Sequence, residues 1–512
     1  MKMVKSLLLG TAAGLVAMTG AQAADLPVKA KPVQYVKICS LYGAGFYYIP
    51  GTDTCIKIGG WARIYDMWGV NGNSTNAGVS TGNVNTRATT NFAIKSRGYI
   101  TVDARNQTEW GTVRSYMAVG YSSNGANGGS AGGVTSGNVS GINTLSAYDA
   151  SSGATGFSAN RAFIQFAGFT FGVTQSFYDF YSQSATSFFG GTVNPASDTG
   201  DAGKFVTSYT AQFGNGLSST IGIEAQRNVG ILNTNNGMGV NSLGTLNTSP
   251  LGIQPASAQE GTQWPDIVAN LRIDQAWGAA QVMGALHDAT GQYYGANTST
   301  GNPSTAVGWA VGAGIKLNAP MIGPGDYFQA QINYDQGAGG YVNASYNNMY
   351  SNVQASKYSF GFLTDAVYGG TVAAGTATSM QLTTSWGVNA AYEHFWNKAW
   401  QTSLYGAYTG VSYNSTANGL LCTMETAAAG GMALNGTTCN NNFSYWNIGT
   451  RTQWNVDSQT YIGVDVMYTT LKTANSGMLS TLGAGTQPAA VRTIGDSSQW
   501  IAQFRVHRNF YP

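Results

Sequence analysis

The segment GYITVDAR, residues 98–105, alternates small or apolar side chains with polar ones along its whole length. Successive side chains of a β-strand point to opposite faces, so Ile100 and Val102 share one face, whereas Asp103 and Arg105 share the other. An ionised side chain facing lipid costs about 2–4 kcal/mol at the bilayer midplane. We therefore expect the apolar face to contact lipid and the charged face to line a water-filled interior.

The same two-residue period recurs along the chain, for example at residues 266–274 and 500–507. Most of the predicted segments have close to the roughly 9–11 residues that a tilted strand needs to cross a bilayer. An even number of strands lets the first pair with the last, which leaves no unpaired edge in hydrocarbon. The pattern predicts sixteen strands, at residues 55–67, 91–106, 112–121, 161–167, 169–177, 204–213, 217–226, 266–275, 279–287, 307–317, 327–334, 385–395, 400–408, 445–455, 460–468 and 499–511.

Short and long connections alternate between these strands. The long connections are rich in Gly, Ser, Asn and Thr. A transmembrane up-and-down β-barrel has short periplasmic turns at one end and long extracellular loops at the other, and this all-β architecture is the predicted fold class. The short junctions are Thr108–Gly111, Ala167–Phe169, Gly214–Gly216, Gln275–Gly278, Asn318–Asp326, Asn397–Trp400 and Asp457–Gln459.

Composition agrees with a barrel and excludes other classes. The 512 residues include only 9% charged residues, yet mean hydropathy is −0.10, which is too polar for a helical membrane protein. Aromatic residues reach 12%, and this content together with the regular strand pattern excludes a disordered chain. Alternation explains the low charged fraction and the intermediate mean hydropathy, because one face of each strand contacts lipid and the other contacts water.

The N-terminus has the pattern of a secretory signal peptide. Basic Lys2 and Lys5 precede an apolar run and a small-residue site that ends at Ala23. We predict a signal peptide at 1–23, an N-terminal periplasmic segment at 24–54 and the barrel at 55–512. Loss of the leader leaves 22 basic and 22 acidic residues, a balance that does not indicate nucleic-acid binding.

Aromatic side chains mark both ends of the predicted strands. Rings with one apolar and one polar edge gather at the two membrane interfaces, so two girdles are expected. The girdle at the tight turns comprises Trp110, Phe169, Phe213, Trp277, Phe328, Trp400 and Trp454, and the girdle at the long loops comprises Tyr121, Tyr334, Tyr408, Trp446, Tyr468 and Trp500.

Four cysteines in an exported chain are expected to be oxidised. They allow three connectivities, which the sequence leaves open. Proximity favours Cys39 with Cys55 and Cys422 with Cys439. Metal binding is the alternative, but neither pair has a Cys or His partner at ligand spacing. We therefore predict disulfides and no metal site.

These features resemble the general-diffusion porins of alphaproteobacterial outer membranes, along essentially the whole mature chain. The most specific segments are 39–60, 169–181, 265–278 and the ending RVHRNFYP at 505–512. The resemblance implies an integral outer-membrane homotrimer of sixteen-stranded barrels, surrounded by lipid and lipopolysaccharide. Each barrel would have a pore narrowed by its third extracellular loop, with ions and small hydrophilic solutes in transit.

The third loop is expected at Tyr178–Gly203, after the fifth strand. Strand parity directs a set of arginines into the lumen from strands that become neighbours when the barrel closes. We hypothesise that this basic wall faces the acidic loop, so that a transverse field crosses the constriction; the alternative is that the arginines only solvate the lumen or pair with lumen carboxylates. The residues are Arg63, Arg97, Arg105, Arg114, Arg161 and Arg505 in the wall, and Asp179, Asp198 and Asp201 in the loop.

The sequence does not indicate an enzyme or a cofactor site. The histidines are His287, His394 and His507, and none has a serine-rich motif nearby that would make a hydrolase. We predict a passive channel. One alternative is a sugar-selective channel with a lumen track of Tyr65, Tyr99, Tyr116 and Tyr405; another is a surface adhesin or enzyme built on a barrel. An energy-coupled transporter would need about 22 strands and a plug.

Overall fold

The computed structural model describes residues 37–69, 83–84, 91–126, 145–149, 153–181, 183–189, 195, 197–200, 203–236, 257–343, 349–353, 356–426, 434–481 and 490–510. Residues 39–512 form one compact unit. Asp201 and the proposed signal peptide lie outside the described residues. Among the described residues, no helix is both long and apolar enough to cross a membrane.

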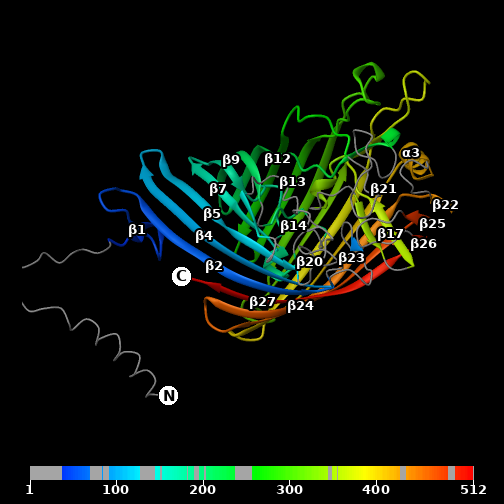
Figure 1. The fold of residues 1–512 in the computed structure, drawn as a ribbon. Helices are drawn as coiled ribbons and strands as arrows, with labels where there is room; N and C mark the ends of the chain where they lie inside the picture. The colour runs from blue at the N-terminus through cyan, green and yellow to red at the C-terminus, as the bar shows by residue number, and fades with distance from the viewer. Residues whose placement is uncertain are drawn as a thin grey trace, which may run out of the picture. The chain divides into compact units, whose positions relative to one another are not determined.

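Sixteen antiparallel strands form a closed barrel, as predicted. The last strand pairs with the first, Trp61 opposite Asn509 and Trp68 opposite Ala502, so the sheet has no free edge. The first and last strands lie side by side in Figure 1, in blue and red. The barrel strands are β2 (Cys55–Trp68), β4 (Phe92–Thr108), β5 (Gly111–Ala126), β7 (Gly153–Phe166), β8 (Phe169–Thr174), β9 (Lys204–Gly214), β10 (Leu217–Glu224), β12 (Asp266–Gln275), β13 (Gly278–Asp288), β14 (Val307–Asn318), β15 (Tyr327–Gln336), β20 (Thr384–Phe395), β21 (Trp400–Ser412), β23 (Phe443–Asn455), β24 (Thr460–Thr473) and β27 (Ser497–Asn509).

Strands β5, β7, β21 and β24 exceed their predicted lengths by four residues or more, and β8 ends three residues earlier than predicted. β5 continues to Ala126 and β7 begins at Gly153, because their hairpin extends beyond the membrane and adds β6 (Leu145–Asp149) at its edge. Hydrophobic alternation marks only the part of a hairpin that contacts lipid. β8 ends at Thr174, where the chain turns into loop three.

Side-chain exposure follows the predicted parity. Ile100 is 52% exposed on the outer face, whereas its neighbour Tyr99 is 3% exposed inside the barrel. Aromatic rings are exposed at both ends, with Trp110 at 72% beside a tight turn and Trp500 at 67% near the long loops. Both disulfides have the predicted pairing, Cys39–Cys55 and Cys422–Cys439.

The segment before the barrel lies against its interior. It contains the 3₁₀ turn η1 (Ser40–Tyr42) and the short strand β1 (Tyr47–Tyr48), which pairs with the start of β2. The Lys57 Nζ donates to the Ala44 carbonyl at 3.3 Å, and the Arg105 guanidinium lies 4.9 Å from the centre of the Phe46 ring. Because Arg105 has lumen parity, this segment lies on the lumen side of β2 and β4.

The extracellular loops fold together into a cap. A six-stranded sheet joins four loops through β3 (Asn83–Val84), β16 (Met349–Val353), β17 (Lys357–Phe362), β22 (Leu434–Thr438), β25 (Ser476–Thr481) and β26 (Ala490–Ile494). A three-stranded sheet combines β11 (Ile231–Asn233), β18 (Ala366–Tyr368) and β19 (Gln381–Leu382). Helix α3 (Ser415–Thr426) also belongs to this region, and Figure 1 shows it at the end of the barrel opposite β1.

An apolar core holds the cap on the inner wall of the barrel. Tyr358, Phe360 and Phe362 of β17 are each at most 1% exposed, and they belong to the same buried cluster as Tyr445 of β23 and Leu471 of β24. Aromatic side chains contribute a large buried area per residue. The loops are therefore fixed to the barrel by packing as well as by backbone pairing.

Candidate functional site: the constriction

Loop three, between β8 and β9, folds into the barrel. Its first limb crosses lumen-facing residues of β12 and β15. The Phe177 carbonyl accepts from the Asn270 amide at 2.6 Å, and the Tyr181 N–H donates to the Gln331 Oε1 at 2.8 Å. The chain then forms the single turn α2 (Gln183–Thr186) and reaches β24, where the Phe188 N–H donates to Asp465 at 2.6 Å.

The tip of the loop packs against the last strand. The Arg505 Nη2 donates to the Phe188 carbonyl at 2.6 Å, and its guanidinium lies 4.2 Å from the centre of the Phe188 ring. The same guanidinium lies 4.5 Å from the centre of the Tyr65 ring on β2. Arg505 thus joins the loop tip to the beginning of the arginine wall.

Buried ion pairs fix the base of the loop. Arg227, just after β10, binds Asp179 and Glu224, each at 2.9 Å, and donates to the Ser197 carbonyl on the returning limb. Burial raises the pKa of the Asp179 carboxyl, and the nearby Arg227 guanidinium opposes that rise. Asp179 therefore holds the loop in place, and its side chain is not open to the lumen.

The other acidic loop residue within the described part of the chain, Asp198, also bonds inside the loop. Its Oδ1 accepts from the Gly200 N–H at 2.8 Å. The Gly200 carbonyl in turn accepts from the Arg161 Nη2 at 2.6 Å. Arg161 on β7 thus supports the returning limb of loop three.

Three arginines of the wall meet at one tyrosine. Arg63 on β2 donates to the Tyr65 hydroxyl at 3.0 Å, and Arg97 on β4 lies 3.5 Å from that oxygen. Arg505 packs on the Tyr65 ring, as described above. Arg63 Nε also donates to His507 Nδ1 at 3.0 Å. Because like charges reinforce one another's field, this cluster is a concentrated source of positive potential.

Aromatic faces support the same cluster. The Trp61 ring stacks on Tyr99 with centroids 4.8 Å apart, and the Arg63 guanidinium lies 4.4 Å from the centre of the Trp61 ring. A guanidinium over an aromatic face is held by the ring quadrupole without losing its charge. The stack therefore fixes the arginine side chains in place.

The row of lumen-facing arginines continues on β4 and β5, where one carboxylate, Asp103, lies between two of them. Asp103 bridges Arg105 at 2.7 Å and Arg114 at 2.9 Å, and the two arginine side chains remain 25% and 27% exposed. Two guanidinium groups around one carboxylate leave a net positive charge. Strand parity identified Asp103 as lumen-facing but did not indicate this bridge.

The hydrogen bonds of loop three can be grouped by the barrel strands that they reach. Its contacts fall on β7, β12, β13, β15, β21, β24 and β27. Strands β2, β4 and β5 complete the ring between β27 and β7. Among the described residues, these hydrogen bonds of loop three thus fall on strands other than β2, β4 and β5, which carry Arg63, Arg97, Arg105 and Arg114.

Several residues that hold the loop were missed by the sequence analysis. Arg227 and Gln331 make its main anchoring bonds, but each lies far from the loop in sequence. The available signal was the pair Glu224 and Arg227, three residues apart at the end of a strand. Charge pairs of this kind are common, so the sequence did not single it out. Two other lumen acids pair with arginines nearby on the sheet: Glu393 of β20 pairs with Arg451 of β23, two strands away, and Asp274 pairs with Arg272 of its own strand.

The histidines occupy structural positions. His287 is completely buried, with Nδ1 2.7 Å from Asp266 and Nε2 3.7 Å from Asp365 of the cap. His394 lies 2.7 Å from Asp326 beside a periplasmic turn. The His287–Asp266 pair has no solvent access and cannot meet a substrate, whereas the His394 side chain is 26% exposed and is held by Asp326.

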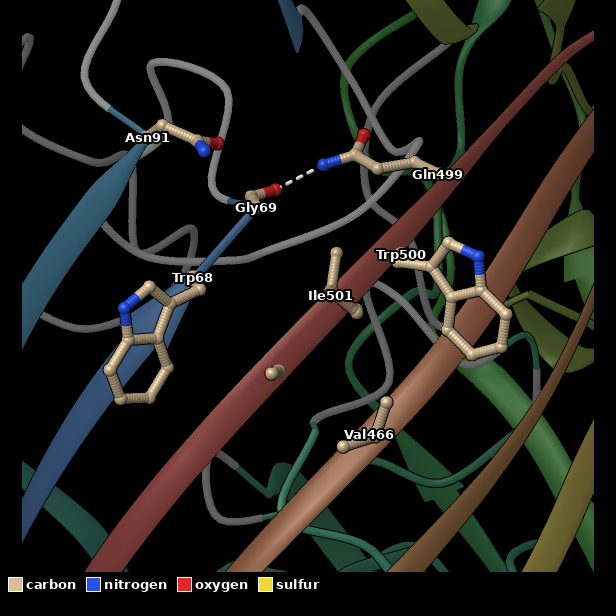
Figure 2. Close-up of a pocket in the computed structure, with 8 residues that line it drawn as sticks. Trp68, Gly69, Asn91, Val466, Gln499, Trp500 and Ile501 are labelled. Carbon is tan, nitrogen blue, oxygen red and sulfur yellow. Dashed lines mark hydrogen bonds between the residues drawn. The ribbon is translucent and has the colours of Figure 1, made fainter.

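A shallow pocket lies on the outer surface where β2, β24 and β27 approach the loops. Figure 2 shows the Trp68 and Trp500 rings at its sides and the Gln499 amide bonded to the Gly69 carbonyl. Gly69 has φ +80°, and a Cβ there would meet the Trp500 carbonyl at 2.6 Å. Both indoles are exposed on the apolar face, so this pocket belongs to the aromatic girdle, not to the lumen.

Comparisons with known proteins agree with this architecture. The sequence profile described as "Porin subfamily" matches residues 25–501. Porin Omp2b of Brucella suis is 31% identical over 345 residues, which cover 62% of this chain and 81% of that protein, and Porin Omp2b of Brucella melitensis is 30% identical over the same extent. The fold is similar to the outer-membrane channel DcaP of Acinetobacter baumannii, with a TM-score of 0.52, 9% identity, and coverage of 90% of this chain and 99% of that one.

Proposed function

This chain belongs to the porin subfamily, and we propose that its channel is narrowed between loop three and the arginine wall of β2, β4 and β5. The protein is an integral outer-membrane β-barrel that forms a passive diffusion channel. Ions and small hydrophilic solutes pass between the loop and the wall. Solutes move down their own gradients, and no reaction or energy coupling is involved.

The observation that carries this proposal is the meeting of Arg63, Arg97 and Arg505 at Tyr65. Their guanidinium groups are held by hydroxyl, carbonyl and aromatic partners, which leave the positive charge in place. Charge lining a narrow aqueous passage sets ion preference. The negative charge of Asp179 is neutralised by its buried ion pair with Arg227. The net electrostatic field at the constriction therefore favours anions. Arg105, Arg114 and Arg161 extend the positive region.

The test is the reversal potential of the purified channel in a planar bilayer with a salt gradient. The triple variant Arg63→Gln, Arg97→Gln and Arg114→Gln should shift the reversal potential toward the cation side. Arg508→Gln is the matched control, since that side chain is 60% exposed at a periplasmic turn. An unchanged potential in the triple variant would refute the role of the wall.

A homotrimer embedded in lipid and lipopolysaccharide is the proposed assembly. The continuous apolar outer face, with Ile64 50% exposed and Ile221 60% exposed, supports contact with lipid or with neighbouring barrels. Chemical cross-linking in native outer membranes should yield dimer and trimer bands. A monomer band alone at saturating cross-linker would contradict the assembly.

The proposed segments are a signal peptide at 1–23, a periplasmic segment at 24–54 and the barrel at 55–512. The family match beginning at residue 25 supports removal of the leader. Mass spectrometry of the mature protein should find Ala24 as its first residue. An intact N-terminus in outer-membrane fractions would contradict cleavage.

We also propose that the protein is a channel without catalytic activity. The complete burial of His287 supports this proposal, because a general base must reach its substrate. A sugar track receives less support, since Tyr65, Tyr99 and Tyr405 are at most 5% exposed. Saturable block of the current by a sugar would favour the track instead.

A further inference from the structure

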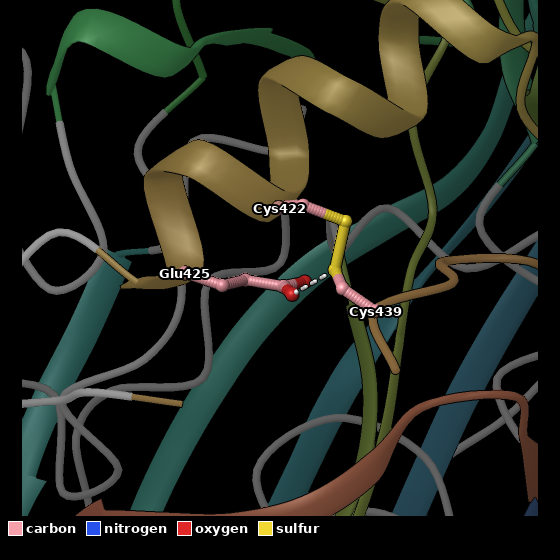
Figure 3. A group of neighbouring side chains, drawn as sticks. All are labelled: Cys422, Glu425 and Cys439. Atoms are coloured by element: carbon pink, nitrogen blue, oxygen red, sulfur yellow. Dashed lines mark hydrogen bonds between the residues drawn. A yellow bond between two sulfur atoms is a disulfide. The ribbon is translucent and has the colours of Figure 1, made fainter. Parts of the chain in front are cut away.

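The Cys422–Cys439 disulfide of the cap lies against a buried carboxyl group. Cys422 is on helix α3, and Cys439 follows β22. Figure 3 shows the Glu425 side chain directed from the same helix toward the disulfide, and its Oε2 lies 2.9 Å from the Cys439 Sγ. Glu425 is 0% exposed, whereas both cysteines are partly exposed.

Glu425 must supply any hydrogen in this contact. A disulfide sulfur has no S–H, so only a protonated carboxyl can donate a hydrogen bond to it. Burial raises the pKa of Glu425 to about 8, which keeps the proton on the carboxyl at neutral pH. The Asn441 and Asn475 side chains lie close enough to the carboxyl to oppose part of that rise, although Oε1 makes no hydrogen bond of normal geometry among the described residues. Diffusion through the channel does not require a buried carboxyl group beside a disulfide in the cap.

The surroundings favour negative charge on sulfur. The Asn441 Nδ2 lies 3.6 Å from the Cys439 Sγ and 3.8 Å from the Cys422 Sγ. Among the described residues, the Tyr413 phenol is a titratable group that interacts electrostatically with Glu425. Burial raises the pKa of that phenol, so it stays neutral at the pH values at which Glu425 titrates. The two cysteines and Glu425 are close enough for a metal ion, but oxidised sulfurs are not thiolate ligands.

We propose that Cys422–Cys439 is a thiol-exchange site in which Glu425 donates a proton to the departing sulfur. The thiolate of a small external thiol attacks the Cys422 Sγ and forms a new S–S bond there. The Cys422–Cys439 bond breaks, and its electron pair leaves on the Cys439 sulfur. That sulfur takes the proton of Glu425, which becomes a carboxylate. A second thiol can then resolve the mixed disulfide and leave both cysteines reduced.

Opening this bond would affect the cap and not the barrel. The disulfide joins α3 to the chain beyond β22, and Ala417, Leu421 and Met424 of α3 are at most 1% exposed in the apolar core of the cap. Cys39 and Cys55 are at most 2% exposed, so their bond should resist the same thiol. Partly exposed disulfides are in general the labile ones.

The test measures the rate at which 2-mercaptoethanol reduces the detergent-solubilised full-length protein. Timed alkylation and mass spectrometry would follow each cysteine peptide. Relative to the wild type, Glu425→Gln should slow the appearance of alkylated Cys439 about tenfold or more at pH 7, because an amide cannot transfer a proton. Glu260→Gln, the same change in another extracellular loop, should leave the rate unchanged. Unmodified Cys39 and Cys55 would report a folded barrel.

A pH profile of the wild type tests the proposal without any variant. The rate constant, expressed per thiolate ion of the reagent, should fall as the pH rises through about 8, where Glu425 loses its proton. In Glu425→Gln the same constant should not vary with pH. Equal and pH-independent rate constants in the two proteins would overturn the proposal. This outcome does not depend on the ion selectivity of the channel.

Discussion

Asp179 in loop three and Arg227 beyond β10 form an ion pair of 2.9 Å whose side chains are 0% and 2% exposed. The pair joins residues 48 positions apart and fixes the base of the loop within the barrel. The position of loop three in the barrel therefore depends on an ion pair that is buried from solvent.

Asp179→Asn should loosen loop three. Breaking a buried ion pair costs up to about 3–5 kcal/mol, and Arg227 keeps Glu224 as its other partner, so we expect a loss at or below the lower end of that range. We expect larger and noisier single-channel currents, with the barrel still folded. The double variant Asp179→Asn with Arg227→Met also removes the partner of the buried Glu224, so it should be less stable than Asp179→Asn alone. Wild-type currents in the single variant would contradict the anchoring role.

Asp103→Asn should make the channel more selective for anions. Asp103 is the carboxylate between Arg105 and Arg114, and its removal exposes both guanidinium groups to passing ions. Reversal potentials in a salt gradient measure the change. Asp274→Asn, on β12, serves as the control and should produce a smaller shift. An equal shift in the two variants would mean that only total lumen charge matters.

Adjacent substitutions should distinguish the two faces of β4. Ile100→Arg places a charge on the outer face and should destabilise the barrel by about 2–4 kcal/mol if residue 100 lies near the midplane. Thr101→Arg should cost less, because it faces water. Urea unfolding in lipid vesicles, followed by tryptophan fluorescence, compares them. Similar losses in both variants would contradict the assigned facing.

Phe360→Ala should open the extracellular cap. Phe360 is 1% exposed within the cap core, and loss of such a ring costs about 3–5 kcal/mol. We expect larger solutes to enter in liposome-swelling assays, while the far-ultraviolet spectrum of the barrel persists. Val372→Ala, at a position 59% exposed, is the control and should behave as wild type. Unchanged solute exclusion in Phe360→Ala would mean that the cap does not limit entry.

The membrane-spanning part of this protein could be predicted from the sequence because its determinant is local. Each strand residue faces either lipid or water, and a charged side chain on the lipid face lowers stability regardless of the rest of the chain. The alternation around Ile100 and Asp103 therefore fixed the facing, and the strand count followed. Proximity in sequence also gave the two disulfides.

Only the tertiary structure decided how the loops use the interior. Arg227 binds Asp179, Asp465 accepts a hydrogen bond from the tip of loop three, and Tyr350 of the cap stacks on Tyr445 of the barrel, each across a long sequence separation. Glycine-rich loops carry no periodic pattern, and many docked conformations satisfy their composition equally well. A few long-range contacts select one of them, so the shape of the constriction and the presence of the cap became visible only in the folded chain.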